Sequence, residues 1–159
     1  EYGERMAPAP LFEALYRSGR YGEKAGAGFY GYGSQSDEPV RSMIEELQRR
    51  GAVRTGTLFE PDRLLLPMIN EAALCLTEHI ANANDIDMAC IAGLGMKRGD
   101  ERMGPLQLAD EMGLDTVLAK LEALCLEFGE RFRPARLLRT KVRAGHLGRK
   151  VGKGFREYA

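Results

Sequence analysis

The sequence carries no excess of charge of either sign and no long apolar run. Its 23 Lys and Arg residues match its 23 Asp and Glu residues, so no global field attracts nucleic acid or an anionic membrane. Apolar stretches such as residues 64–69 are far too short to cross a bilayer. These absences predict that the protein has neither a nucleic-acid partner nor a membrane span.

Cysteine and histidine are also scarce. Cys75, Cys90 and Cys125 stand at wide spacings among apolar neighbours, which is typical of reduced core residues. His79 and His146 lie far apart, and neither is at metal-ligand spacing from a cysteine or another histidine. Reduced thiols and the lack of a signal-peptide pattern favour a cytoplasmic protein, and we expect no metal site.

The sequence does contain enough apolar residues, 44% of 159, for an ordinary soluble domain with a real core. Apolar positions recur at helical spacing and no segment alternates with period two, so the pattern predicts an all-α bundle. Pro67 should place a helix start nearby or kink its helix, and Asp85 and Asp115 are the expected N-caps of two others. Helices are expected over residues 38–50, 61–83, 85–93 and 115–128, with two more beginning at 105 and 134.

An internal repeat is the most informative feature. The pattern P-A-x-L, followed by G-x-x-G-x-K-x-G-x-G-F-x-x-Y, occupies residues 8–32 and returns 126 positions later at residues 134–158. The second copy ends a complete repeat unit, whereas the first carries only the signature. We therefore expect residues 1–33 to be the tail of a truncated first copy, 34–57 a linker with a short helix, and 58–159 a complete second copy. Residue 1 is Glu, which we also take to indicate a piece of a longer polypeptide.

Two glycine motifs within the repeat resemble phosphate-binding loops without meeting their requirements. Residues 26–31 match G-x-G-x-x-G, but no buried strand precedes them and no helix follows directly. Residues 148–154 have three residues between the glycines where a Walker loop has four, and they lack its final Ser or Thr. We favour structural turns anchored by Phe29 and Phe155. The functional alternative is a phosphate site, for instance for a coenzyme, formed by Arg149, Lys150 and Lys153.

Asn70 and Glu71 are polar residues within an apolar helix. A carboxylate among Leu, Met and Ile neighbours could carry a raised pKa suited to proton transfer. The alternative is a buried side chain that pairs with a neighbouring helix. No nucleophile stands at a recognisable spacing from a base, so the residues alone indicate a helical interaction or substrate-covering domain.

An ordered series of motifs covers nearly all of residues 60–158. It consists of R-L-L-L-P-M-I-N-E-A at 63–72, D-I-D at 85–87, G-P-L-x-L-A-D at 104–110, G-L-D at 113–115, R-F-x-P at 131–134 and G-R-K-x-G-x-G-F at 148–155. This series resembles the C-terminal domain of 3-hydroxyacyl-CoA dehydrogenases. Two tandem copies are similar to the arrangement in multifunctional fatty acid β-oxidation proteins.

The resemblance implies a helical bundle of the 6-phosphogluconate dehydrogenase C-terminal-domain-like fold. It implies a parent oxidoreductase that converts (3S)-3-hydroxyacyl-CoA to 3-oxoacyl-CoA with NAD, which a preceding Rossmann domain would bind. The helical domain would pack on that domain and on the first C-terminal copy, contribute to a homo-oligomer, and close over acyl-CoA. No stretch matches the family's catalytic His motif, so we expect this chain alone to be inactive and to bind no cofactor.

The resemblance also yields substrate-contact candidates. In the family an Asn normally precedes the Arg of the long helix, but here Asp62 precedes Arg63. The substrate-contact candidates are Asp62, Arg63, Asn70 and Glu71. An anionic side chain beside a thioester carbonyl would oppose developing negative charge, so the departure indicates a second copy that serves architecture more than substrate contact. The rival interpretation is a non-catalytic helical scaffold whose basic glycine-rich tails bind a polyanion such as RNA.

Overall fold

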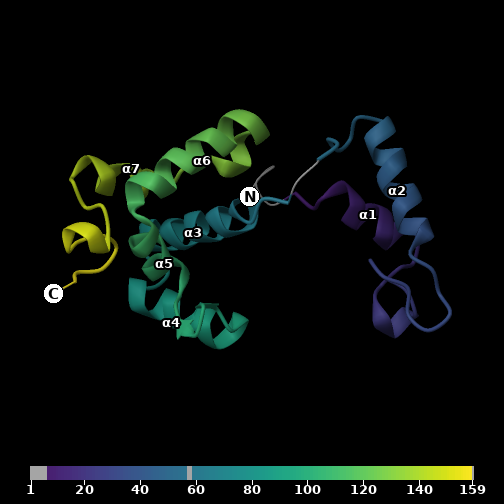
Figure 1. Cartoon of the computed structure of the whole chain (residues 1–159), viewed down its shortest axis with the longest axis horizontal. Helices are drawn as coiled ribbons and strands as arrows, with labels where there is room; N and C mark the ends of the chain where they lie inside the picture. Colours follow the sequence, from purple (N-terminus) through teal and green to yellow (C-terminus); the bar gives the residue numbers. More distant parts are fainter. Residues whose placement is uncertain (1–6, 57–58, 159) are drawn as a thin grey trace. The chain divides into compact units, whose positions relative to one another are not determined.

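The computed structural model describes residues 7–56 and 59–158, which belong to two compact units. Unit 1 comprises residues 1–59 and unit 2 residues 60–159. Both units are built from helices joined by short connections (Figure 1). The all-α class predicted from apolar periodicity is therefore confirmed.

Within residues 7–56, unit 1 contains two helices and a short turn between them. α1 (Pro10–Arg17) begins with a proline at its first position, where a missing amide leaves no hydrogen bond unmade. α2 (Glu38–Arg49) ends one residue before its expected end, and the 3-10 turn η2 (Glu23–Ala25) lies between the helices. The buried apolar core is small, because among the described residues it consists of Leu15 and Val40.

Unit 2 is a larger bundle in which α3 is central. Its elements are α3 (Asp62–Thr77), α4 (Ala83–Leu94), β1 (Lys97–Arg98), β2 (Glu101–Arg102), α5 (Pro105–Met112), α6 (Leu114–Phe128), η3 (Glu130–Phe132), α7 (Arg136–Arg143) and η4 (Arg149–Val151). Helix α3 contacts α4, α5, α6 and α7, and α5 lies between α3 and α4 (Figure 1). The short helix α5 is thus surrounded by longer elements.

The hydrophobic core of unit 2 lies where α3, α6 and α7 meet. Leu66 and Ile69 of α3 are fully buried in one cluster with Leu121 of α6 and Leu138 of α7. Burying each such side chain contributes roughly 1.5–3 kcal/mol. Packing of these apolar faces therefore fixes the helices that carry the polar residues described below.

Several helix ends differ from those expected. Helix α3 ends at Thr77, well before residue 83, because the chain leaves the helix through His79 at a positive φ of 55°, and it continues through Pro67. The N-cap of α4 is Asn82, whose side-chain oxygen accepts a hydrogen bond from the amide of Asp85 at 3.0 Å. The expected cap, Asp85, therefore lies in the first turn of the helix. The side chain of Asn82, directly before the helix, already accepts a hydrogen bond from the backbone N–H of Asp85. Similarly, α6 begins at Leu114 after Gly113, so the residue expected to cap it lies within its first turn.

The loop between α4 and α5 contains the β1–β2 hairpin, which the sequence did not predict. Its strands have two residues each and turn through Gly99 at a φ of +61°, so they leave the all-α class unchanged. No described helix is long and apolar enough to cross a membrane. Within residues 7–56 and 59–158, no group of three or more His, Cys, Asp or Glu could hold a metal ion.

Candidate functional site

The repeated signature forms the same compact turn in both units. In unit 2 this turn, residues 145–158, begins where Gly145 ends α7 at a φ of +75° and continues through Gly148 and Gly152 at +96° and +74°. The amide of Gly148 donates to the carbonyl of Lys153 at 2.8 Å, and that of Tyr158 to the carbonyl of Gly152 at 2.9 Å. Positive φ values of this size favour glycine. We call this segment the glycine turn of unit 2.

The glycine turn of unit 1, residues 19–32, repeats this geometry. Gly19, Gly22 and Gly26 have φ values of +75°, +98° and +71°, close to those of their counterparts 126 positions later. The amide of Tyr32 donates to the carbonyl of Gly26 at 3.0 Å, as the corresponding tyrosine does in unit 2. The internal repeat is therefore a repeat of structure as well as of sequence.

A buried carboxylate is the centre of the glycine turn in unit 2. Asp110 of α5 is only 1% exposed and accepts hydrogen bonds from the amides of Phe155 (2.8 Å) and Arg156 (3.0 Å) and from the hydroxyl of Tyr158 (2.9 Å). Burial raises the pKa of Asp110, and these hydrogen bonds together with the charge of Lys141 oppose that rise. Burial and the bond to this carboxylate raise the pKa of the Tyr158 hydroxyl.

Two glycines are required where the turn meets α5. A side chain at Gly148 would collide with the backbone of Asp110, and a side chain at Gly154 would collide with its carboxylate. The predicted role of these glycines as points of close approach thus has a specific partner. The glycine spacing predicted a close approach, but it did not identify the buried acid that fills the turn.

A cation also supports each glycine turn. In unit 2 the ammonium of Lys141 on α7 donates to the carbonyl of Gly154 at 2.7 Å and lies 5.4 Å from the ring centre of Phe155. Burial lowers the pKa of Lys141, while the charge of Asp110 raises it. In unit 1 the carbonyl at the same place in the turn, that of Gly28, accepts from Nε of Arg20 at 2.7 Å.

A second buried carboxylate, Asp87 of α4, connects three elements. It is fully buried and accepts the amides of Leu106 (2.8 Å) and Gln107 (3.1 Å) in the first turn of α5. It also accepts Nη2 of Arg156 from the glycine turn at 2.6 Å. A carboxylate at a helix N-terminus is favoured by the partial positive charge of the first turn. Helix α5 is therefore held at its N-terminus by Asp87 and near its C-terminus by Asp110.

The substrate-contact candidates on α3 do not lie together. Asp62 forms an ion pair with Lys120 at 2.6 Å, and the guanidinium of Arg63 lies 4.1 Å from the ring centre of Phe128, so both face α6. Asn70 and Glu71 lie two turns further along the helix, where Glu71 is half-buried.

Asn70 is 2% exposed and connects α3 to the segment before α7. Its side-chain amide donates to the carbonyl of Arg133 at 2.9 Å, and its oxygen accepts the amide of Ala135 at 2.7 Å. The two bonds satisfy backbone groups more than 60 positions away. Asn70 thus has the pairing role that the sequence allows as the alternative to proton transfer.

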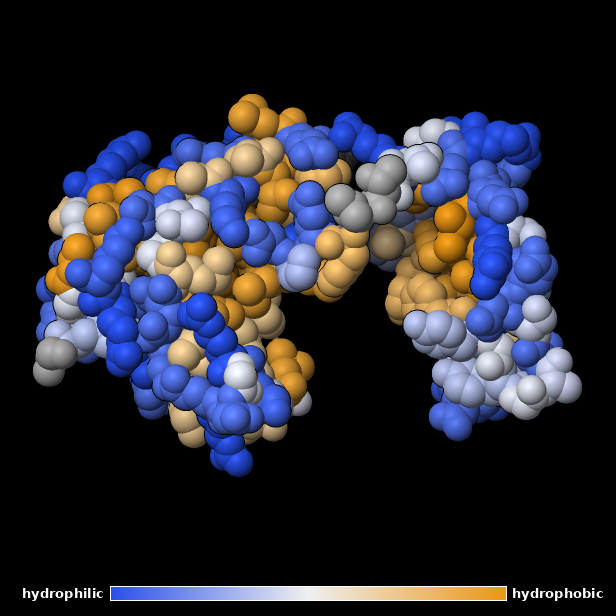
Figure 2. All heavy atoms as spheres, viewed as in Figure 1, coloured by the Kyte–Doolittle hydropathy of each residue, from blue (hydrophilic) through white to orange (hydrophobic). Residues whose placement is uncertain are grey.

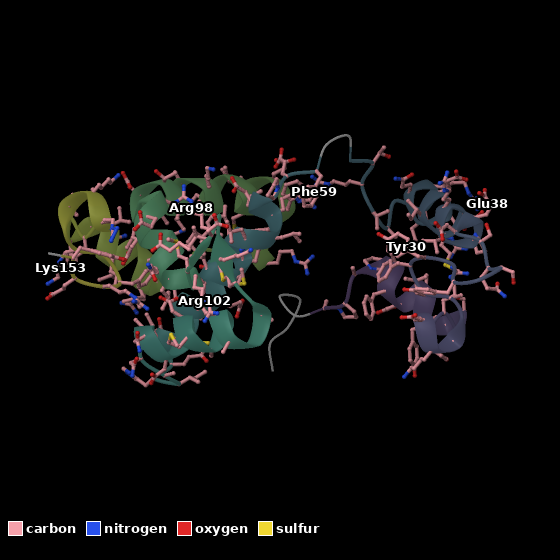
Figure 3. The ribbon with its side chains drawn as sticks, turned by 60° about the horizontal axis from the view of Figure 1, so that its bottom comes forward. Tyr30, Glu38, Phe59, Arg98, Arg102 and Lys153 are labelled. Carbon is pink, nitrogen blue, oxygen red and sulfur yellow. The ribbon has the colours of Figure 1, made fainter. Side chains whose placement is uncertain are left out.

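The phosphate-contact candidates are all paired with carboxylates of unit 2. Arg149 bonds Glu111 at 2.9 Å, and Lys150 bonds Asp115 at 2.6 Å. Lys153 bonds a residue of its own turn, Glu157, at 2.7 Å. Figure 3 shows Lys153 at the end of unit 2 formed by the glycine turn, apart from Arg98 and Arg102.

The described residues contain no nucleotide-binding geometry. Most amides of the second glycine turn, including those of Gly148, Gly152 and Gly154, already donate to backbone oxygens or to Asp110, and a buried carboxylate repels a phosphate. Residues 26–31 follow the 3-10 turn η2, and among the described residues they are preceded by no strand beyond an isolated bridge and followed directly by no helix. Neither glycine motif fits a dinucleotide.

Unit 2 is a small helical bundle in which a glycine turn binds a buried acid, Asp110. Its sequence matches the family model for the 3-hydroxyacyl-CoA dehydrogenase C-terminal domain over residues 59–158. The chain therefore belongs to the 3-hydroxyacyl-CoA dehydrogenase family, with unit 2 as its C-terminal domain.

Curated relatives and solved structures agree with this family. A probable 3-hydroxybutyryl-CoA dehydrogenase of Deinococcus radiodurans is 43% identical over 128 residues, which cover 77% of this chain and 44% of that protein. A fatty acid oxidation complex subunit alpha of Idiomarina loihiensis is 38% identical over 148 residues, covering 91% of this chain and 21% of that subunit. The crystal structure of (S)-3-hydroxybutyryl-CoA dehydrogenase from Ralstonia eutropha aligns with a TM-score of 0.59 at 38% identity, over 80% of this chain and 45% of that one. The chain thus spans less than half the length of these relatives.

Proposed function

We propose that this chain is the C-terminal helical region of an NAD-dependent 3-hydroxyacyl-CoA dehydrogenase of fatty acid β-oxidation, located in the cytoplasm. The parent enzyme would oxidise a (3S)-3-hydroxyacyl-CoA to the 3-oxoacyl-CoA. The helical region would supply packing surfaces within a homo-oligomer and one wall of the acyl-CoA cleft. The family match over residues 59–158 carries this proposal, and the names of the relatives support the substrate class.

In this proposal NAD is bound by a Rossmann domain elsewhere in the parent polypeptide. When bound, the cofactor accepts the hydride from the substrate. The glycine motifs described above do not fit it, so no step of the reaction is assigned to residues of this chain. Residues 1–33 are the tail of a first C-terminal copy, which the matching geometry of the two glycine turns supports. The linker then covers residues 34–57 and the second copy residues 58–159.

Substrate contact is proposed for Asp62, Arg63, Asn70 and Glu71 in this copy, and coenzyme phosphate contact for Arg149, Lys150 and Lys153. Because each of the three cations already bonds a carboxylate, a phosphate would have to replace those partners. We therefore expect packing to dominate over substrate binding in this copy.

Isothermal titration of the chain with acetoacetyl-CoA, with and without NADH, tests the proposal together with an assay of NADH oxidation. Binding without turnover is expected if this copy forms a wall of the cleft. Turnover would contradict the assignment of catalysis to another domain. Salt-dependent RNA binding with no acyl-CoA effect would instead favour a polyanion-binding scaffold, because counterion release makes phosphate contacts weaken with salt.

A further inference from the structure

Unit 1 has an open apolar groove beside α1. It encloses about 360 Å³ between that helix and the glycine turn. Phe12 and Tyr16 of α1 are 61% and 69% exposed, and Phe29 of the turn is 47% exposed. Figure 2 shows apolar residues gathered on the side of unit 1 where α1 lies and hydrophilic residues along α2. A contiguous exposed surface of this kind is typical of a binding site.

Unit 2 reveals what occupies the same place. Gly22 and Gly28 line the groove, and their counterparts 126 positions later are Gly148 and Gly154. A side chain at either counterpart would collide with Asp110 of α5. The groove of unit 1 therefore corresponds to the position that an acid-bearing helix fills in unit 2.

The apolar walls correspond as well. The counterparts of Phe12 and Phe29 are Leu138 and Phe155, and both of these pack on the core of unit 2. Leu138 is fully buried there, whereas Phe12 is mostly exposed. The rings of Phe12 and Phe29 contact each other at 5.9 Å between centres, so they form one continuous apolar surface for a helix to cover.

The glycine turn beside the groove carries the same kinds of donor that bind a carboxylate in unit 2. In unit 2 two amides and a tyrosine hydroxyl converge on Asp110. Their counterparts in unit 1 are the amides of Phe29 and Tyr30 and the hydroxyl of Tyr32. Within the part of the chain that the structure describes, these three groups donate to no protein acceptor. Since the turn has the same geometry in both units, one carboxylate could accept all three hydrogen bonds.

Two charged positions define the occupant further. Lys150 bonds Asp115 at the start of α6, and its counterpart Lys24 lines the groove without an ion-pair partner among the described residues. Arg149 bonds Glu111, but its counterpart in unit 1 is Glu23. The occupant should therefore carry two aspartates five residues apart and a basic residue directly after the first.

We propose that the groove of unit 1 is the docking site for a helical segment of the parent polypeptide, the first-copy counterpart of α5 and the start of α6, with the pattern D-(K/R)-x-x-x-D. This proposal rests on the proposed function, in which residues 1–33 belong to a first C-terminal copy. A second molecule of this chain fits less well, because its own α5 presents Glu111, which would face Glu23.

Fluorescence anisotropy of the full chain with a labelled synthetic peptide tests the proposal. The peptide comprises residues 103–122 with Glu111→Lys, and two comparison peptides have either the native Glu111 or Asp110→Asn added to Glu111→Lys. The lysine peptide should bind saturably, and the native-Glu111 peptide about three- to tenfold more weakly, because like charges then oppose each other. Asp110→Asn should weaken binding about tenfold or more, because the charge-assisted hydrogen bonds are lost.

Matched variants of the chain locate the bound peptide. Tyr32→Phe removes one donor in unit 1 and should weaken binding about three- to tenfold, whereas Tyr158→Phe, the same change in unit 2, should leave it unchanged. Absence of binding, equal binding of the Asp110→Asn peptide, or sensitivity to Tyr158→Phe alone would overturn the proposal. Sedimentation showing a dimer that Phe29→Ser dissociates would assign the groove to a second copy instead. The experiment uses neither acyl-CoA nor NADH, so its failure is distinct from failure of the proposed function.

Discussion

Replacing Asp110 with asparagine tests whether the buried acid closes unit 2. The carboxylate accepts three hydrogen bonds, from the amides of Phe155 and Arg156 and the hydroxyl of Tyr158. An asparagine keeps one acceptor oxygen and places an NH2 group against the remaining donors. Losing one to two such bonds in a buried place costs about 2–3 kcal/mol, which lowers the melting temperature of a domain of this size by about 8–20 °C.

Thermal unfolding followed by circular dichroism measures this effect. The matched control is Glu157→Gln, which removes an exposed acid of the same glycine turn and should leave the melting temperature of unit 2 unchanged. The reasoning is refuted if Asp110→Asn melts within 2–3 °C of the parent chain, a shift of roughly half a kcal/mol. The acid would then be a tolerated polar group rather than the centre of the turn.

The same variant has a predictable pH dependence. Because burial raises the folded-state pKa of Asp110 above its unfolded value, the stability that this group contributes is fully present below the unfolded pKa and is lost as pH rises through the folded one. Asparagine does not titrate. The stability difference between parent and variant should therefore be larger near pH 4 than at pH 7, and urea unfolding at both values measures it; a larger difference at pH 7 would contradict the assigned direction.

Three further substitutions test the other contacts. Arg156→Met leaves the fully buried Asp87 without its cation and should lower the free energy of unfolding, measured in urea, by about 2–4 kcal/mol. A change below about 0.5 kcal/mol would show that the two amides of α5 alone stabilise the buried Asp87 carboxylate. Asn70→Ala removes both bonds to the segment before α7 and should lower the free energy of unfolding by about 2–3 kcal/mol, measured in the same way; retention of the parent stability would show that these bonds do not hold the segment. Asp62→Asn should tighten acetoacetyl-CoA binding about three- to fivefold by removing like-charge repulsion of ~1 kcal/mol, while Glu122→Gln, another exposed ion-paired acid, should not; equal titrations of both variants would place Asp62 away from the substrate.

Much of the helical architecture of unit 2 follows from the spacing of apolar residues. Ile69, Leu121 and Leu138 each belong to a series of apolar residues at helical spacing within its own helix, and these residues meet in the core. The motif order predicted the family, which the match over residues 59–158 confirms. Periodicity is a local property, so it indicates which face of a helix is buried without stating which helix covers it.

The polar site was harder to predict because its contacts join residues far apart in the sequence. Asp87 and Asp110 look like ordinary helix acids in their own segments, and their partners lie 45 to 69 positions later in the glycine turn. The glycine spacing was the one available signal, because it predicted a close approach without identifying the approaching group. Helix ends were missed for a related reason: Asn82 and His79 end or begin helices through side-chain and backbone geometry that hydrophobic spacing does not report.

The cation that binds the carbonyl of Gly28 or Gly154 has a consequence for exchanging the two turns. Arg20 supplies it from inside its turn, whereas Lys141 supplies it from the helix before the turn, so the two copies are not interchangeable parts. In a chimera with residues 19–32 in place of 145–158, the transplanted Arg20 and the resident Lys141 would both approach the same glycine carbonyl. The chimera would then need Lys141→Leu, because Leu15 is the counterpart of Lys141 in unit 1. The reciprocal chimera would have no lysine or arginine at this carbonyl, because Leu15 and His146 occupy the corresponding positions. Each turn therefore functions only together with its own cation.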